Sequence, residues 1–376
     1  MRLPFRILPP IAAFALLSAC GGDSGPSAPT QRLVAVGRLE RGATVRLVAR
    51  DGAAADSLVA SVALSPATAG TVAGSTVKLL QAGQVSVTAV APDGRTISAV
   101  LDVKAPPTVF FDGAITGNRD IYSVSLDGGE PKRWTTSTGE DTHPSVAAGL
   151  LVFSSTRDGN SELYSLPTAA GGAERRLTTS AANETQPSLS ATAANVAYTS
   201  DASGLPRLFV APVSLVGATR LTAASFGFGG SIETDPTWSS AGDRIAFMST
   251  ANGRANLFIT SAAAGSTPAE VNGSNSQVTD VEPTWSPDGK RIAFASTRAG
   301  GTQLFLLDVQ SGAVSPATTG AASSGQPGWL PDGRVVFTVF GNAGSTLWWI
   351  DPATTDPAIE IPTGTKSPAH STGVRP

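Results

Sequence analysis

Short apolar runs, broken by Gly, Pro, Asp and Asn, make up most of the chain. In several of them apolar and polar residues alternate, as in TVRLVAR from Thr44 to Arg50 and QVSVTAV from Gln84 to Val90. Such alternation predicts β-strands with one buried face. No run beyond the N-terminus keeps the apolar spacing of a helix, so the pattern predicts an all-β protein.

A longer pattern recurs at nearly constant spacing. PTWSSAGDRIAFMSTANG begins at Pro236 and PTWSPDGKRIAFASTRAG begins at Pro283, and related segments begin at Pro144, Pro187 and Pro327. The prolines are 43, 49, 47 and 44 residues apart. Each proline is predicted to lead into a short strand. A turn, an apolar strand and a third strand such as NLFITSA follow, and in three of the repeats a fourth strand comes next. Four strands in a repeat of about 40–50 residues are typical of a β-propeller blade.

The first repeat is incomplete, because the segment from Thr108 supplies strands two to four without a proline-led first strand. The segment SPAHSTG, from Ser367 to Gly373, matches such a first strand. We therefore expect this C-terminal strand to enter the first blade and close the ring, which removes open sheet edges. With Pro368 counted, the six first strands predict a six-bladed propeller.

The motifs P-x-W-S-P-D-G, R-I-A-F and S-T-R resemble those of TolB-like propellers, which are relatives of WD-repeat propellers. The resemblance covers residues 108–376. It implies a propeller that binds a protein or another cell-envelope component. TolB itself carries an α/β domain before its propeller, whereas residues 32–104 of this chain predict a small β-sandwich. The partners of TolB are therefore not carried over to this chain.

Residues 32–104 contain the segment AGTVAGSTVKLLQAGQVSVTAVAPDG, which resembles bacterial Ig-like domains. The chain has one cysteine, so the cysteine pair of antibody domains is absent from this module. We interpret the module as a spacer between the membrane and the propeller. A specific adhesive site is the alternative.

The N-terminus predicts export and anchoring. Two arginines precede the apolar run Ile7–Leu17, which is typical of a secretory signal. The run ends in LSAC, which resembles the lipobox of bacterial lipoproteins and implies a signal peptide of residues 1–19, cleavage before Cys20 and lipid on Cys20. Residues 20–31 then form a flexible tether, and the lack of an aspartate after Cys20 favours the outer membrane. An ordinary signal peptide with a free cysteine is the alternative.

Composition and histidine count exclude several functions. The net charge of −3 and the scarcity of lysine argue against nucleic-acid binding. GDSGP, which contains Ser24, matches the nucleophile motif of trypsin-like proteases, but the two histidines, His143 and His370, both follow it, whereas that family has its histidine and aspartate before the serine. We therefore predict a non-catalytic, monomeric binding protein, with a glycan-binding or glycan-cleaving propeller as the alternative.

The residues before the prolines are the candidate site. In a propeller the chain enters each first strand at the mouth of the central channel, so these residues are predicted to form a polar ring. They are His143, Gln186, Asp235, Glu282, Gln326 and Ser367. We expect the ring to contact a ligand or partner. No cofactor is expected, except that Asp235 and Glu282 are candidate ligands of a divalent cation, with His143 as a third; a hydrated channel is the alternative.

One loop is predicted to take part in binding. The segment SFGFGGSIET, from Ser225 to Thr234, lengthens the connection between the third and fourth repeats. Phe226 and Phe228 lie among glycines there, and exposed aromatic side chains suit a protein contact. The alternative is that both rings fold down and fill the channel.

Overall fold

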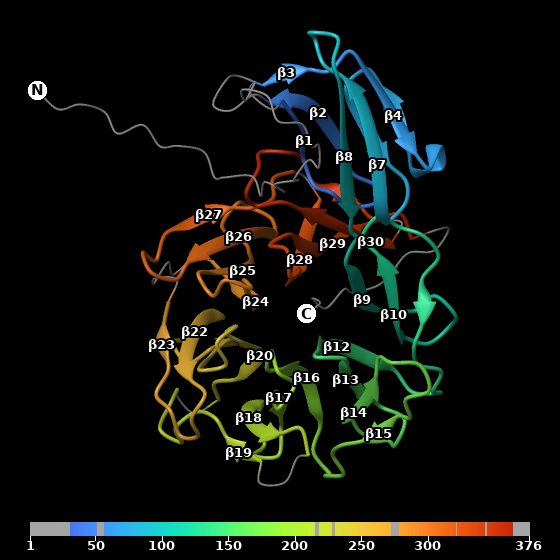
Figure 1. Ribbon diagram of the computed structural model, residues 1–376. Helices are drawn as coiled ribbons and strands as arrows, with labels where there is room; N and C mark the ends of the chain where they lie inside the picture. The colour runs from blue at the N-terminus through green and yellow to red at the C-terminus, as the bar shows by residue number, and fades with distance from the viewer. Residues whose placement is uncertain are drawn as a thin grey trace, which may run out of the picture. The chain divides into compact units, whose positions relative to one another are not determined.

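The computed structural model describes residues 31–50, 56–214, 218–227, 230–271, 278–320, 322–342 and 344–363 (Figure 1). The chain divides into two units, Met1–Pro106 and Pro107–Pro376. The predicted signal peptide, Cys20, Phe228 and the predicted strand Ser367–Gly373 lie outside the described residues. In the ranges described, no helix is both long and apolar enough to span a bilayer.

In its described residues, the first unit contains two β-sheets and one 3-10 turn, η1 (Ala67–Ala69). One sheet has the strands β1 (Arg32–Val36), β2 (Thr44–Arg50), β3 (Ser57–Leu58), β5 (Gly70–Ala73) and β6 (Thr76–Leu79), and the other has β4 (Ser61–Ser65), β7 (Gly83–Val90) and β8 (Thr96–Val103). Val45 and Leu47 of the first sheet share one buried cluster with Val85, Val87 and Leu101 of the second. The unit is therefore a β-sandwich; its relation to Ig-like domains stays a prediction.

The second unit consists of consecutive antiparallel sheets, as the repeats predict. The first has three described strands, β9 (Thr108–Gly113), β10 (Asp120–Ser125) and β11 (Lys132–Arg133). Five four-stranded sheets follow, in which each strand pairs with the next along the chain. Their innermost strands surround the centre of the unit in Figure 1 and are β12 (Asp141–Ala147), β16 (Glu184–Leu189), β20 (Glu233–Trp238), β24 (Asp280–Trp285) and β28 (Ser323–Trp329).

The other strands of these five sheets lie progressively farther from the centre (Figure 1). The second strands are β13 (Leu150–Ser155), β17 (Asn195–Ser200), β21 (Arg244–Ser249), β25 (Arg291–Ser296) and β29 (Val335–Gly341); the third are β14 (Glu162–Pro167), β18 (Arg207–Pro212), β22 (Asn256–Ser261), β26 (Gln303–Asp308) and β30 (Gly344–Ile350); and the outer ones are β15 (Arg175–Arg176), β19 (Thr219–Arg220), β23 (Ala269–Glu270), β27 (Val314–Pro316) and β31 (Ile359–Glu360). The all-β class predicted from the sequence is confirmed.

Aromatic pairs stabilise the sheets from within. An aromatic residue in the second strand faces one in the third strand, with ring centroids 5.8 to 6.2 Å apart. The pairs are Phe153–Tyr164, Tyr198–Phe209, Phe247–Phe258 and Phe294–Phe305. Such pairs add about 0.5–1.5 kcal/mol to the gain from burial alone. The repeated phenylalanine of the R-I-A-F motif is therefore a core residue.

Tryptophans of the innermost strands join neighbouring sheets. The Trp238 Nε1–H donates to the carbonyl of Ser188 in the preceding sheet at 2.9 Å, and the Trp329 Nε1–H donates to that of Thr284 at 3.1 Å. The guanidinium of Arg291 lies 5.0 Å from the Trp329 ring centroid. These contacts satisfy the indole N–H of Trp238 and Trp329, whereas that of Trp285 has no partner among the described residues. The burial of apolar faces between sheets is therefore what the recurring tryptophans share.

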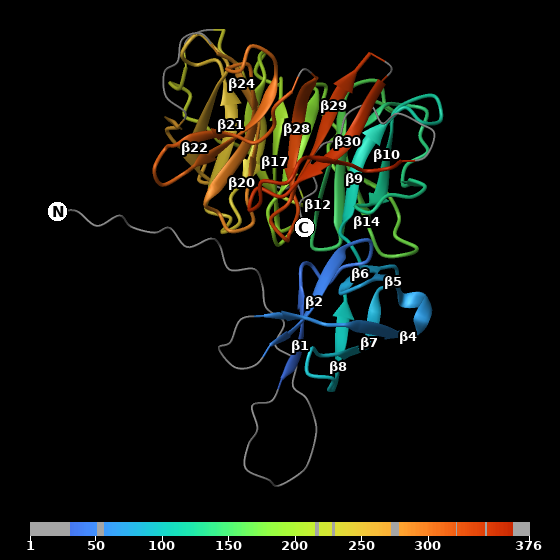
Figure 2. The same cartoon turned by 90° about the horizontal axis from the view of Figure 1, so that it is seen from above.

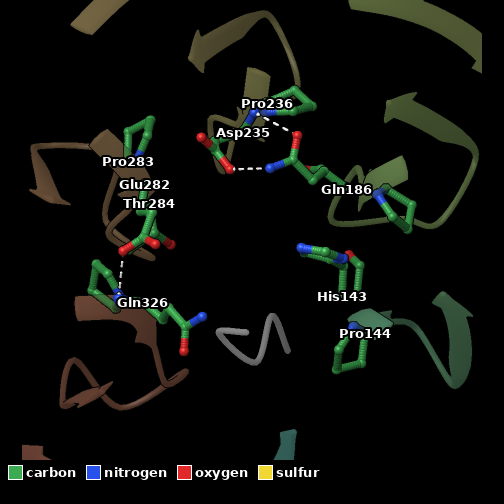
Figure 3. Close-up of a pocket in the computed structure, with 13 residues that line it drawn as sticks. His143, Pro144, Gln186, Asp235, Pro236, Glu282, Pro283, Thr284 and Gln326 are labelled. Atoms are coloured by element: carbon green, nitrogen blue, oxygen red, sulfur yellow. Dashed lines mark hydrogen bonds between the residues drawn. The ribbon is translucent and has the colours of Figure 1, made fainter. Parts of the chain in front are cut away.

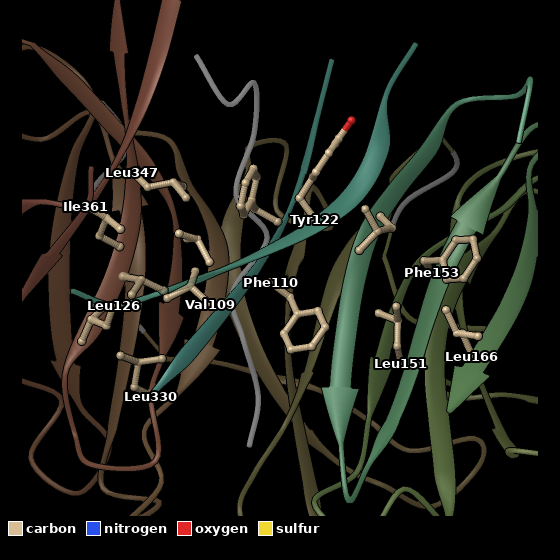
Figure 4. Packing of buried hydrophobic residues seen from close by; sticks show 14 of the residues in the cluster. Val109, Phe110, Tyr122, Leu126, Leu151, Phe153, Leu166, Leu330, Leu347 and Ile361 are labelled. Atoms are coloured by element: carbon tan, nitrogen blue, oxygen red, sulfur yellow. The ribbon is translucent and has the colours of Figure 1, made fainter. Parts of the chain in front are cut away.

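The first and last sheets pack against each other (Figures 1 and 2). Val109 and Leu126, around the first sheet, share a buried cluster with Leu330, Leu347 and Ile361 of the last (Figure 4). The backbone N–H of Gly129 also donates to the carbonyl of Pro362 at 2.9 Å. The described sheets thus meet across a continuous core. The predicted entry of Ser367–Gly373 into the first sheet stays a prediction.

Candidate functional site

Each of the five innermost strands contains a β-bulge at its proline. On β20, Thr234 pairs with Met248 and Thr237 pairs with Ala246, so that Asp235 and Pro236 together face one residue of β21. The same shift occurs in the other four strands. Proline has no N–H to give to the ladder, so a bulge accommodates it. The prediction that prolines lead the strands is therefore wrong: the strands begin three or four residues earlier.

The residue before each proline has a left-handed backbone. The φ angles are 54° at His143, 52° at Gln186, 55° at Asp235, 55° at Glu282 and 53° at Gln326. Bulges with a left-handed first residue normally place glycine there, and a following proline restricts the backbone further. Each such position costs about 1–3 kcal/mol and persists where the surrounding structure imposes it. The chain thus repeats a strained conformation five times, each time with a polar side chain instead of glycine.

These five residues line one pocket in the channel (Figure 3). The pocket has a volume of about 150 Å³. Its other lining residues are Ser145, Ser188, Thr284 and the five prolines of the bulges. The structure therefore brings His143, Gln186, Asp235, Glu282 and Gln326 together; Ser367 lies outside the described residues.

Gln186 and Asp235 form a reciprocal pair across two blades. The Gln186 amide donates to the Asp235 carboxylate, and the Asp235 backbone N–H donates to Gln186 Oε1 at 3.3 Å. Thr199 donates to Gln186 Oε1 at 3.0 Å, and Thr234 donates to Asp235 Oδ2 at 2.9 Å. Burial raises the pKa of Asp235, and the hydrogen bonds from Thr234 and Gln186 oppose this shift. The bonds between blades help to hold the strained backbone in place.

Glu282 lies beside this pair and belongs to the next blade. Its Oε2 accepts the backbone N–H of Gln326 at 2.6 Å. Burial, with a smaller contribution from the charge of Asp235, raises the pKa of Glu282 to about 7. Two carboxyl groups from adjacent blades therefore lie at one side of the pocket, and the negative charge of Asp235 disfavours the ionised form of Glu282.

Asp112 is a residue that the sequence analysis missed. It lies on β9 and is 1% exposed, and its carboxylate pairs with Arg119. Burial raises its pKa to about 7, while Arg119 and the backbone N–H of His143 favour the charged form. Aligning TVFFDG with LLVFSS would have found it, because a carboxylate stands where the second repeat has Ser154.

The structure places no third acidic or histidine ligand beside Asp235 and Glu282 among the described residues. Within the described ranges, no group of three or more His, Cys, Asp or Glu side chains is placed to hold a metal ion. His143 instead shares a hydrogen bond of 3.0 Å between its Nδ1 and Thr142 Oγ1. Asp235 and Glu282 stay a predicted pair for a divalent cation.

Phe226 is not an exposed contact residue, so that prediction is wrong. Its ring is half-buried and lies edge-on to Phe258 at 5.3 Å and to Phe247 at 6.2 Å. It does not line the channel pocket either. The ring joins the aromatic cluster of its own blade, because that cluster removes more apolar surface from water than an exposed position.

A central pocket surrounded by four-stranded antiparallel sheets defines a β-propeller with an axial site. The family model of the TolB beta propeller domain matches residues 147–267 and 228–356, together more than half of the chain. The chain belongs to this family. No curated protein matches the chain.

Solved structures share this architecture. TolB from Acinetobacter baumannii is similar with a TM-score of 0.59 and 16% identity, over 76% of this chain and 81% of that protein. The putative TolB from Agrobacterium tumefaciens gives 0.52 and 18%, over 61% and 83%. Hydrazine synthase from Kuenenia stuttgartiensis gives 0.53 and 12%, over 69% and 47%. At these identities the likeness concerns the fold.

Proposed function

We propose that this protein is an exported, lipid-anchored, non-catalytic scaffold whose propeller channel face binds a protein or another component of the cell envelope. The observation that carries the proposal is the ring before the prolines. Five non-glycine residues occupy bulge positions where glycine would relieve strain. Strained backbone of this kind gathers at ligand-binding sites, and membership of the TolB propeller family supports a binding role.

The size of the pocket favours a partner that inserts one group. Pockets for drug-sized ligands usually measure about 300–1,000 Å³, whereas this pocket measures about 150 Å³. A cavity of this size suits a single side chain from a larger molecule that rests on the channel face. We therefore prefer a protein partner to a small metabolite.

The test is affinity capture from envelope extracts with wild-type protein and a ring variant. Glu282→Gly/Gln326→Gly removes two ring side chains but leaves backbone angles that glycine adopts readily. Glu360→Gln, on the outer strand β31, is the matched control because Glu360 is exposed away from the pocket. We expect wild type and control to enrich the same protein and the ring variant to lose it.

Equal capture by the ring variant would overturn the proposed role of the channel. A glycan array run in parallel addresses the alternative function. Binding of an oligosaccharide by wild type, lost in the ring variant without any captured protein, would replace the protein partner with a glycan.

Lipid anchoring rests on Cys20 and has its own test. Cys20→Ala is expected to move the protein from the membrane fraction to the soluble fraction, because the acyl chains supply the stable attachment. Ser24→Ala, in the same tether, is the matched control and should stay in the membrane fraction. Membrane partitioning that Cys20→Ala leaves unchanged would contradict the lipoprotein assignment.

A further inference from the structure

The channel pocket offers acceptors, while several of its own donors are already used. Neither lysine nor arginine is among the residues that line it in the described chain. The Gln186 amide donates to the Asp235 carboxylate, and the Asp235 backbone N–H donates to the Gln186 side-chain oxygen. The Gln326 backbone N–H donates to Glu282. The pocket therefore suits a ligand that donates hydrogen bonds.

Glu282 supplies one of these acceptors, and it is a carboxylate. Its Oε2 is taken by the Gln326 N–H, whereas its Oε1 receives no hydrogen bond from any described residue. The side chain is half-buried and lines the pocket (Figure 3). A partly desolvated carboxylate oxygen that faces a cavity attracts a positive charge more strongly than one in bulk water.

The walls and the acceptor geometry distinguish between cations. The rings of five prolines line the pocket, and they present apolar surface without N–H groups. Such walls suit the methylene stem of a lysine, which packs on apolar surface while its charged tip meets a polar group. Arginine favours a carboxylate with both oxygens available for its planar fork, whereas an ammonium is a compact charge with three donors. With one oxygen occupied, Glu282 favours the ammonium.

We propose that the pocket receives a primary ammonium group, the tip of a lysine side chain of the partner, with Glu282 Oε1 as its principal acceptor. Asp235 adds negative charge from the adjacent blade. This inference rests on the proposed function, since it names the chemical group that the partner inserts.

The probes are three capped amino acids: the N-acetyl methylamides of lysine, norleucine and arginine. Norleucine keeps the apolar stem without the charge. NMR signals of the Gln186 and Gln326 side-chain amides report on binding. The lysine probe is expected to shift them saturably in the millimolar range, at least tenfold more tightly than either other probe. Glu282→Gln should remove this preference, and Glu360→Gln should keep it.

The pH dependence separates a charge contact from a shape contact. Affinity for the lysine probe should rise several-fold between pH 6 and pH 8, because Glu282 loses its proton in that range. Asp235 and His143 face the same pocket, so Asp235→Asn and His143→Asn are measured alongside. The rise should remain in both variants and vanish in Glu282→Gln.

Three results would overturn the inference: norleucine binding as tightly as lysine, arginine binding more tightly, or no saturable shift with the lysine probe. A shift with calcium chloride alone, without one for the lysine probe, would assign the carboxylates to a metal instead. If the ring variant Glu282→Gly/Gln326→Gly loses the captured protein but the wild type does not bind the lysine probe, the proposed function still holds. Only the proposal that the pocket receives an ammonium group would then be rejected. Lysine binding combined with unaffected capture would remove the channel function instead.

Discussion

The two halves of each innermost strand have opposite characters. On β24, Glu282 is half-buried, has a φ of 55° and lies in a bulge, whereas Trp285, three residues later, is 5% exposed. Trp285 belongs to a buried cluster with Phe294 and Phe305. One half therefore stabilises the fold, and the other half keeps strained polar groups at the channel. The free energy gained by packing in one half offsets the cost of the strained backbone in the other half.

The largest expected effect is in the packed half. Phe294→Ala removes a fully buried ring that packs against the tilted ring of Phe305, and we expect a loss of about 3–5 kcal/mol in the free energy of unfolding. Glu282→Gln, in the strained half of the neighbouring strand, is the comparison variant and should change stability much less at pH 5. Urea denaturation measures both. Similar losses would mean that the two halves do not differ as described.

A smaller effect concerns pH and the strained half. The pKa of Glu282 is raised to about 7 from 4.5. Its contribution to stability is therefore complete below pH 4.5 and is lost as the pH rises through 7. For a half-buried group the loss is at most on the order of 3 kcal/mol. Melting curves at pH 5 and pH 8 should show a larger decline for wild type than for Glu282→Gln.

If the melting temperature falls equally between pH 5 and pH 8 in wild type and in Glu282→Gln, a group other than Glu282 causes the pH dependence of stability. Asp112 and Glu184, whose pKa burial also raises to about 7, would then be the groups to replace, as Asp112→Asn and Glu184→Gln. Stability that increased with pH in the wild type alone would contradict the assigned direction.

The smallest expected effect is the relief of strain. Gln326→Gly places glycine at a φ of 53°, where it fits, and should leave stability unchanged or raise it by up to about 1 kcal/mol. Gln84→Gly is the matched control, because Gln84 is exposed in the regular strand β7. The control should cost about 0.5–1 kcal/mol. Equal losses in denaturant titrations would show that the bulge carries no strain.

The repeats explain how much the sequence predicts. Fixed spacing of P-T-W-S and R-I-A-F gives the all-β class and brings the residues before the prolines into one ring, because equivalent positions in repeated blades lie around one axis. Pairing register inside a strand is harder to predict. The bulge at Pro283 depends on a ladder partner in β25, so the strand was predicted to start too late.

Positions that depend on distant packing escaped prediction. Phe226 lies in a glycine-rich loop, and only the three-dimensional fold brings it against Phe258 of β22. Asp112 is a buried acid in an otherwise apolar strand, and its partner Arg119 follows a turn. Local pattern carries no information about the Phe226 contact or about the pairing of Asp112 with Arg119, although aligning the repeats would have singled out Asp112 itself. The ring follows directly from repetition.

The most direct test of the central claim is photo-crosslinking from the ring. A diazirine amino acid replaces Gln326 in one protein and Glu360 of the outer strand β31 in another, and both are irradiated in envelope extracts. A partner that contacts the channel face should crosslink from position 326 and not from position 360. Crosslinking to the same partner only from position 360, or equally from both positions, would contradict the assignment of the channel as the binding surface.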